Sequence, residues 1–164
     1  MIAAHPVDHT LDYIYQSERA MFKYKHILAA VDYTAEARLV LQHAKSLAER
    51  YGADLTLLHV VELMPVVGGI ESFSYVDLYA DQPELIERAE SDLKNLAADE
   101  QLTAVNLKIL TGVPKVEITA YAKDNNIDLI VVGSHGRHGI SLILGSTANA
   151  VLHYAKCDVL AVRV

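Results

Sequence analysis

The 164-residue chain is predicted to form an α/β protein: a three-layer α/β/α sandwich on a five-stranded, mostly parallel sheet. Two observations support this prediction. Short apolar runs rich in β-branched residues alternate with segments of helical period, in the order β-α-β-α-β-α-β-α-β. Hydrophobic residues make up 52 % of the chain, which is enough for a sizeable core. Such alternation is typical of a parallel sheet that carries helices on both faces.

The N-terminal segment differs from the rest of the chain. Residues 1–20 have mixed polarity and no clear period, whereas residues 21–164 are predicted to form one domain. Two interpretations of this extension stay open. It is either a cloning remnant or over-long start, or a short native arm that packs on the domain.

The first predicted strand, His26–Val31, ends at Asp32, and a helix is predicted over Ala35–Arg50. A carboxylate at the carboxyl end of a parallel strand lies where open α/β sheets bind ligands. The alternative is a structural role, because Asp32 or Thr34 can cap the helix that follows. Both roles are compatible if Thr34 caps the helix and leaves Asp32 free.

The other predicted elements follow in regular order. Strands are expected at Leu55–Val61, Asn106–Leu110, Leu129–Gly133 and Val159–Val164, and helices at Leu85–Glu100, from Pro114 to Asn125, and from Ser146 to Ala155. His59, inside the second strand, is expected to be packed or hydrogen-bonded in the core. The stretch Glu62–Pro83 has little period, which suggests a lid, a binding loop or a mobile segment.

Composition excludes several classes of protein. The net charge of −7 argues against a nucleic-acid partner, which would require a basic face. No apolar run approaches the roughly 20 residues of a membrane span, and residues 1–20 lack the apolar segment of a signal peptide. The single cysteine, Cys157, excludes an internal disulfide and fits a cytoplasmic location.

Familiar phosphate-binding motifs are absent, but a different glycine pattern is present. The sequence contains no G-x-x-x-x-G-K-[ST], and no G-x-G-x-x-G follows the first strand. It does contain Gly133-x2-Gly136-x8-Gly145-Ser146, followed by Thr147 at a helix start. A helix start with small residues is a ready anion site, because its first N–H groups lack partners and the helix dipole favours negative charge.

With the opening KHILAAVD and the closing CDVLAVRV, this pattern resembles the universal stress protein family over Lys25–Val164. The sequence is similar to the branch that binds ATP, whose pattern is written G-x2-G-x9-G-[ST]. Here one residue fewer separates the last two glycines, within the apolar stretch Ile140–Leu144. The resemblance implies a flavodoxin-like or adenine nucleotide alpha hydrolase-like fold.

The resemblance also implies a role for each matching position. Asp32 would contact the adenosine, Ala30 and Val31 would line its pocket, and Val60 or Val61 would contact adenine. Backbone at Gly133 and Gly136 would approach the ribose and phosphates, and Gly145, Ser146 and Thr147 would donate hydrogen bonds to the β- and γ-phosphates. His135 or Arg137 would serve as a charge partner of the triphosphate. The expected ligand is ATP, alone or with Mg²⁺, and no separate metal site and no catalytic residue are expected.

The expected function is therefore that of a cytoplasmic, ATP-binding regulatory or stress-response protein with slow or no ATP hydrolysis. Two alternatives stay open: a slow ATPase or phosphotransferase, and a dimeric interaction module without nucleotide. The resemblance further implies a homodimer through the final strand, Val159–Val164. A protein partner is expected as well, but the sequence does not identify it.

Overall fold

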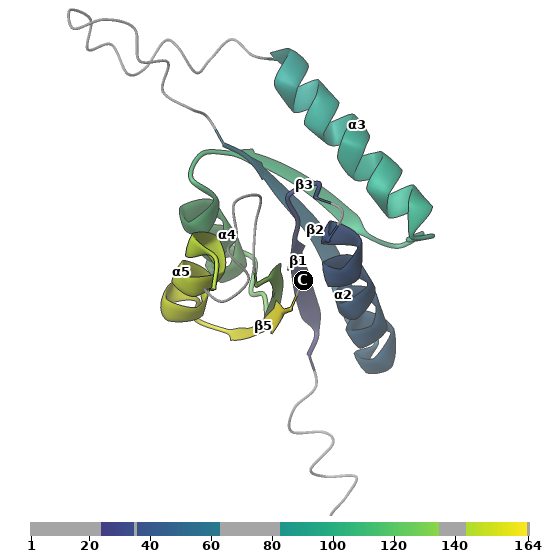
Figure 1. Cartoon of the computed structure of the whole chain (residues 1–164). Coiled ribbons are helices and arrows are strands. Elements are labelled where there is room, and N and C mark those ends of the chain that lie inside the picture. The colour runs from purple at the N-terminus through teal and green to yellow at the C-terminus, as the bar shows by residue number, and fades with distance from the viewer. Residues whose placement is uncertain (1–23, 35, 63–82, 135–143, 164) are drawn as a thin grey trace, which may run out of the picture.

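A computed structural model describes residues 24–34, 36–62, 83–134 and 144–163. Strands and helices alternate along these residues (Figure 1). The elements are β1 (His26–Ala30), α2 (Ala37–Tyr51), β2 (Asp54–Val61), α3 (Pro83–Asp99), β3 (Asn106–Thr111), α4 (Pro114–Asp124), β4 (Leu129–Gly133), α5 (Ser146–Tyr154) and β5 (Asp158–Val162).

The five strands form one sheet in the order β3-β2-β1-β4-β5, and every neighbouring pair is parallel. The predicted five-stranded parallel sheet is therefore confirmed. The strand order is not the flavodoxin order, 2-1-3-4-5, but matches the first five strands of the dinucleotide-binding order, 3-2-1-4-5-6. The direction in which the chain adds strands reverses between β1 and β4, so this is the topological switch point of the sheet.

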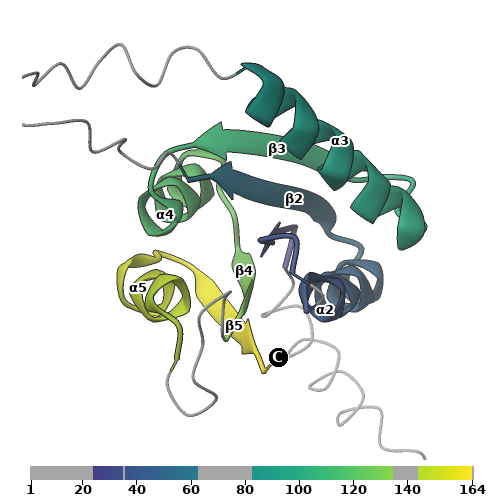
Figure 2. The same ribbon diagram turned by 45° about the horizontal axis from the view of Figure 1, so that its top comes forward.

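The predicted three-layer arrangement is confirmed, because helices pack on both faces of the sheet. α2 and α3 cover one face, and α4 and α5 cover the other (Figures 1 and 2). Side chains of β1 alternate between the two cores, because successive residues of a strand point to opposite faces. Ile27 and Ala29 pack in the core under α2 and α3, whereas Leu28 and Ala30 pack in the core under α4 and α5.

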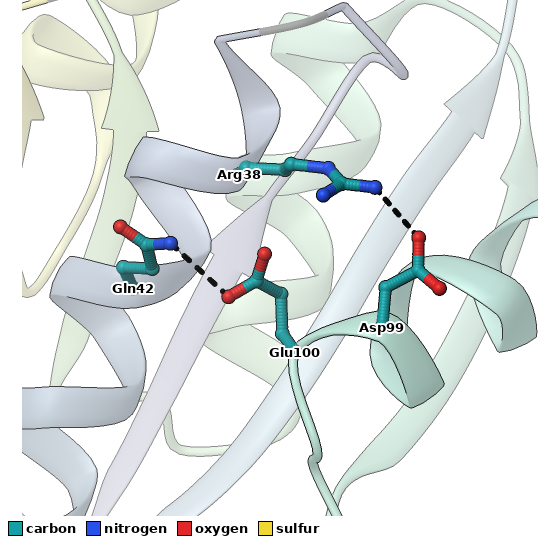
Figure 3. Close-up of polar contacts among 4 residues, drawn as sticks. All are labelled: Arg38, Gln42, Asp99 and Glu100. Atoms are coloured by element: carbon teal, nitrogen blue, oxygen red, sulfur yellow. Dashed lines mark hydrogen bonds and ion pairs between the residues drawn. The ribbon is translucent and has the colours of Figure 1, made fainter.

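Polar contacts join α2 to the C-terminal end of α3 (Figure 3). Arg38 forms an ion pair with Asp99 at 2.6 Å, and the Gln42 amide donates a hydrogen bond to Glu100 at 3.2 Å. The Lys45 ammonium donates a further hydrogen bond to the backbone carbonyl of Glu100 at 2.8 Å. The Arg38 and Gln42 contacts are exposed and the Lys45 contact is partly buried, so we expect a modest contribution to stability from the two exposed pairs.

The element boundaries differ from the prediction at two helix starts. The first helix begins at Ala37 rather than Ala35, and its N-cap residue, Glu36, makes no side-chain cap hydrogen bond. The next helix begins at Pro83 rather than Leu85, and Leu85 is 44 % exposed in its first turn. Gly52 ends α2 with a φ of 61°, a left-handed conformation that favours glycine.

Three other predictions concern the N-terminal extension, the long loop and the final strand. The predicted N-terminal extension, residues 1–20, and nearly all of the predicted loop, residues 63–82, lie outside the described residues. The final strand, β5, lies at an edge of the sheet. Its role in a homodimer stays a prediction.

Candidate functional site

A cavity of about 930 Å³ opens at the carboxyl end of the sheet. Its walls include the ends of β1 and β4, so it lies at the topological switch point, where open α/β sheets bind their ligands. The volume falls within the range of roughly 300–1,000 Å³ that is typical of small-molecule sites.

Nine of the twelve predicted site residues line this one cavity. They are Ala30, Val31, Asp32, Val60, Val61, Gly133, Gly145, Ser146 and Thr147. The other three, His135, Gly136 and Arg137, lie outside the described residues. The fold therefore brings together residues from four separate segments of the chain, but their roles in binding stay predictions.

The Asp32 carboxylate is held by a tight local turn. Its Oδ1 accepts a hydrogen bond from the backbone N–H of Thr34 at 3.2 Å and another from the Thr34 hydroxyl at 2.7 Å. Tyr33, between them, has a φ of 59°. The possibility that Thr34 caps the next helix and leaves Asp32 free is not realised, because the N-cap residue of α2 is Glu36, with no side-chain cap hydrogen bond, and Thr34 donates to Asp32. The effect is to orient Asp32 in the wall of the cavity.

Two rings that line the cavity support this turn. His59 Nδ1 lies 2.8 Å from the backbone carbonyl of Val31, and since a carbonyl only accepts, Nδ1 carries the proton. The His59 ring packs on the Tyr33 ring, with centroids 4.0 Å apart and an interplanar angle of 36°. His59 is hydrogen-bonded, as predicted, but it is half-buried in the cavity wall rather than in the core. Tyr33 was missed, although an aromatic residue directly after a strand-end carboxylate was a visible signal.

The Tyr33 hydroxyl donates a hydrogen bond to the backbone carbonyl of Ala89 in α3. Burial raises the pKa of this phenol, and the negative charge of Asp92 raises it further. The hydroxyl therefore stays protonated at neutral pH and remains a donor. This hydrogen bond connects the end of β1 to a helix 56 positions away in the sequence.

The second predicted cluster forms at the start of α5. The Gly145 N–H donates to the backbone carbonyl of Ser134 at 2.7 Å, which brings the helix start next to the end of β4. The first hydrogen bond within the helix runs from Asn149 N–H to Gly145 at 2.9 Å. The N–H groups of Ser146 and Thr147 precede it and have no acceptor within the helix. This helix end therefore offers donors and a favourable dipole to an anion in the cavity.

α3 contributes a wall that the sequence analysis did not assign to the site. Its residues at the cavity fall at i, i+3, i+4 and i+7, which is one face of a helix: Leu85, Arg88, Ala89 and Asp92. The spacing was visible in the sequence, but nothing there showed that this face lines the cavity at the carboxyl ends of the strands. The described lining residues are mostly acidic among the Asp, Glu, Lys and Arg side chains. They include one guanidinium, that of Arg88, and four carboxylates, those of Asp32, Glu36, Glu62 and Asp92.

Two further findings concern the described part of the chain alone. It contains no group of three or more His, Cys, Asp or Glu side chains placed to hold a metal ion. None of its helices is both long enough and apolar enough to cross a membrane. His135, a predicted charge partner, and His138 fall outside the residues to which the first finding applies.

A parallel α/β sheet with a cavity at its switch point, and a helix start in the cavity wall, defines the class of open-sheet α/β proteins. The family is shown by comparison. A family model described as Universal stress protein family matches residues 23–163, and the chain belongs to this family.

Individual relatives agree with this assignment. The chain is similar to Universal stress protein A homolog 1 of Coxiella burnetii, with 40 % identity over 139 residues that cover 85 % of this chain and 96 % of the relative. It is also similar to the solved universal stress protein UspA from Lactobacillus plantarum, with a TM-score of 0.68, 28 % identity, and coverage of 87 % of this chain and 99 % of that one. A universal stress protein from Archaeoglobus fulgidus, solved in complex with dAMP, shares the fold with a TM-score of 0.60 and 22 % identity, covering 85 % of this chain and 98 % of that one.

Proposed function

We propose that this protein binds ATP in the cavity at the switch point and acts as a cytoplasmic regulatory or stress-response protein, with slow or no ATP hydrolysis. One observation carries the proposal: the Asp32 turn and the start of α5 line the same cavity. A carboxylate that suits a ribose hydroxyl and a helix start that suits phosphate are thus available to one ligand.

The charges along the cavity favour one orientation of the nucleotide. Asp32 and Asp92 lie at the end of the cavity near Tyr33. Arg88 lies 3.9 Å from Asp92 and offsets part of its charge, so the Asp32 carboxylate is the main source of repulsion for a triphosphate at this end. The start of α5 carries the positive end of a helix dipole and N–H groups that have no acceptor within the helix. We therefore place the adenosine near Asp32, with Val60 and Val61 against the adenine, and the phosphates near Gly145 and Ser146.

The acidic lining also bears on the ion that accompanies ATP. Since carboxylates outnumber cationic side chains among the described lining residues, the triphosphate would gain from a bound Mg²⁺ that offsets part of its charge. Mg²⁺ is usually bound by one or two carboxylates together with phosphate oxygens. The lining residues would therefore hold Mg²⁺ only together with a bound nucleotide. We assign no catalytic residue.

The family comparison supports the chemical class of the ligand. The Archaeoglobus fulgidus protein with the same fold was solved in complex with dAMP, an adenine nucleotide. The adenine preference of this chain rests on its resemblance to the ATP-binding branch of the family, and the anion site rests on the geometry at α5.

Calorimetric titration of the purified chain with ATP, ADP, adenosine and GTP tests the proposal. We expect ATP and ADP to bind, adenosine to bind more weakly because it lacks phosphates, and GTP to bind more weakly than ATP. Phosphate release, measured over hours, should be slow or absent. No binding of any nucleotide would favour the interaction module, and sustained turnover would favour the ATPase.

A further inference from the structure

Tyr33 adopts a backbone conformation that a residue with a bulky side chain rarely adopts. Its φ is 59°, in the left-handed region, at a position directly between Asp32 and Thr34. Such a conformation persists only where the surroundings hold it in place, and these conformations gather at functional sites. The contacts of the Tyr33 side chain therefore indicate which part of the site this backbone conformation holds in place.

Both ends of the Tyr33 side chain are engaged. The hydroxyl donates to the Ala89 carbonyl of α3 at 2.5 Å, and the ring packs on His59, which itself hydrogen-bonds to Val31. These contacts hold the residues on either side of Asp32: Val31 through His59, and Tyr33 through α3. The carboxylate is then oriented by Thr34. All members of this set line the cavity.

We propose that Tyr33 is a positioning residue for the ligand: it locks the Asp32 turn against α3, so that the nucleoside end of the cavity is formed before the ligand binds. The inference rests on the proposed nucleotide function. Without the Tyr33 hydroxyl bond, the turn would sample other conformations, and binding would have to restore the productive one at a cost in affinity. α3, which presents Arg88 and Asp92 to the cavity, would lose its hydrogen bond to the same turn.

The protein contains a matched control for the test. Tyr24 also donates a phenol hydrogen bond, to Asp158 at 2.9 Å, but it precedes β1, at the opposite end of the sheet from the cavity. Tyr33→Phe and Tyr24→Phe each remove one hydroxyl and leave a ring. Comparable thermal melting of the two variants would show that both keep the fold.

Adenosine and ATP are titrated into the wild type and both variants. We expect Tyr33→Phe to weaken both ligands by roughly fivefold, and Tyr24→Phe to leave both affinities unchanged. Wild-type affinity in Tyr33→Phe would overturn the positioning role while leaving the proposed function intact. Absence of binding in the wild type would overturn both.

A double-mutant cycle separates positioning from a general structural role. If Tyr33 acts through the Asp32 carboxylate, Tyr33→Phe should have little effect on adenosine affinity in an Asp32→Ala background, where no carboxylate remains to be oriented. If the fivefold loss persists in that background, the two effects are additive and the inference is wrong. The cycle uses adenosine because it lacks the phosphates that the α5 end would bind.

Discussion

The Gly145 N–H donates a hydrogen bond to the backbone carbonyl of Ser134 at 2.7 Å. Ser134 directly follows β4, and Gly145 is the N-cap residue of α5, so this bond fixes the helix start beside the end of the strand. The N–H of Ser134 in turn donates to Val162 of β5 at 2.7 Å. The proposed phosphate end of the cavity is therefore anchored to two strands of the sheet.

Replacing Gly145 by valine should weaken ATP binding at least roughly tenfold, about 1.4 kcal/mol, because the side chain would occupy space meant for phosphate. The backbone tolerates the change: Gly145 has φ −57° and ψ 150°, and Val113 already serves as the N-cap of α4. Calorimetry with adenosine is the control, since adenosine should lose little affinity. Equal losses for both ligands would mean that the valine disturbs the whole cavity.

Ser146→Ala should weaken ATP binding by about 1 kcal/mol, because one hydroxyl hydrogen bond to phosphate is lost and water partly replaces it. Ser46→Ala in α2 is the matched control, since Ser46 is exposed and does not line the cavity. The two variants are compared by ATP titration. Unchanged affinity in Ser146→Ala would leave only backbone donors at the helix start.

Asp32→Ala should weaken ATP and adenosine by the same factor, roughly tenfold, because the contact is placed at the nucleoside end. Alanine also leaves the Thr34 hydroxyl and N–H without their acceptor, whereas Asp32→Asn keeps an acceptor oxygen for the turn. We expect the asparagine variant to lose less affinity than the alanine variant in the same titrations. A loss confined to ATP would place Asp32 near the phosphates or their Mg²⁺ instead.

A substitution in the edge strand β5 tests the predicted homodimer. The Asp158 N–H donates to Asp128, and the Val162 carbonyl accepts from Ser134, so the backbone groups of both residues face the β4 side. Backbone groups of successive strand residues point to alternate sides, so the N–H and C=O of Ala161 point away from β4, toward the open edge. Ala161→Pro removes an outward N–H and leaves the β4 ladder intact, as edge strands tolerate. Light scattering should then show a monomer, against a dimer for the wild type. A wild-type monomer at micromolar concentration would contradict the prediction.

Two substitutions in α2 should separate surface from core contributions to stability. Arg38→Ala should lower the free energy of unfolding by no more than about 1 kcal/mol, because both partners of the Arg38–Asp99 pair are more than half exposed. Leu41→Ala, at a fully buried position on the same helix, should cost about 2–5 kcal/mol. Urea denaturation of both variants measures the difference. A larger loss for Arg38→Ala would show that the ion pair holds α2 and α3 together.

The sequence by itself determined the layered parallel architecture. The alternation of strand and helix periods, the glycine that ends α2 and the Gly-Ser-Thr start of α5 are local signals, readable from neighbouring residues. Local signals also pointed to Asp32 and the two glycine clusters, and the family resemblance added the other residues that line the same cavity. Strand ends in a parallel sheet meet at one edge whatever the order of the strands.

The tertiary structure alone decided how those strands are ordered and which side chains surround the strand ends. Periodicity reports which face of an element is buried, but not the neighbour against which it packs. The Tyr33 hydroxyl finds its acceptor 56 positions away, in α3, and the Thr34 hydroxyl donates to Asp32. Such choices depend on the relative positions of whole elements, which are set by packing across the core rather than by residues adjacent in the chain.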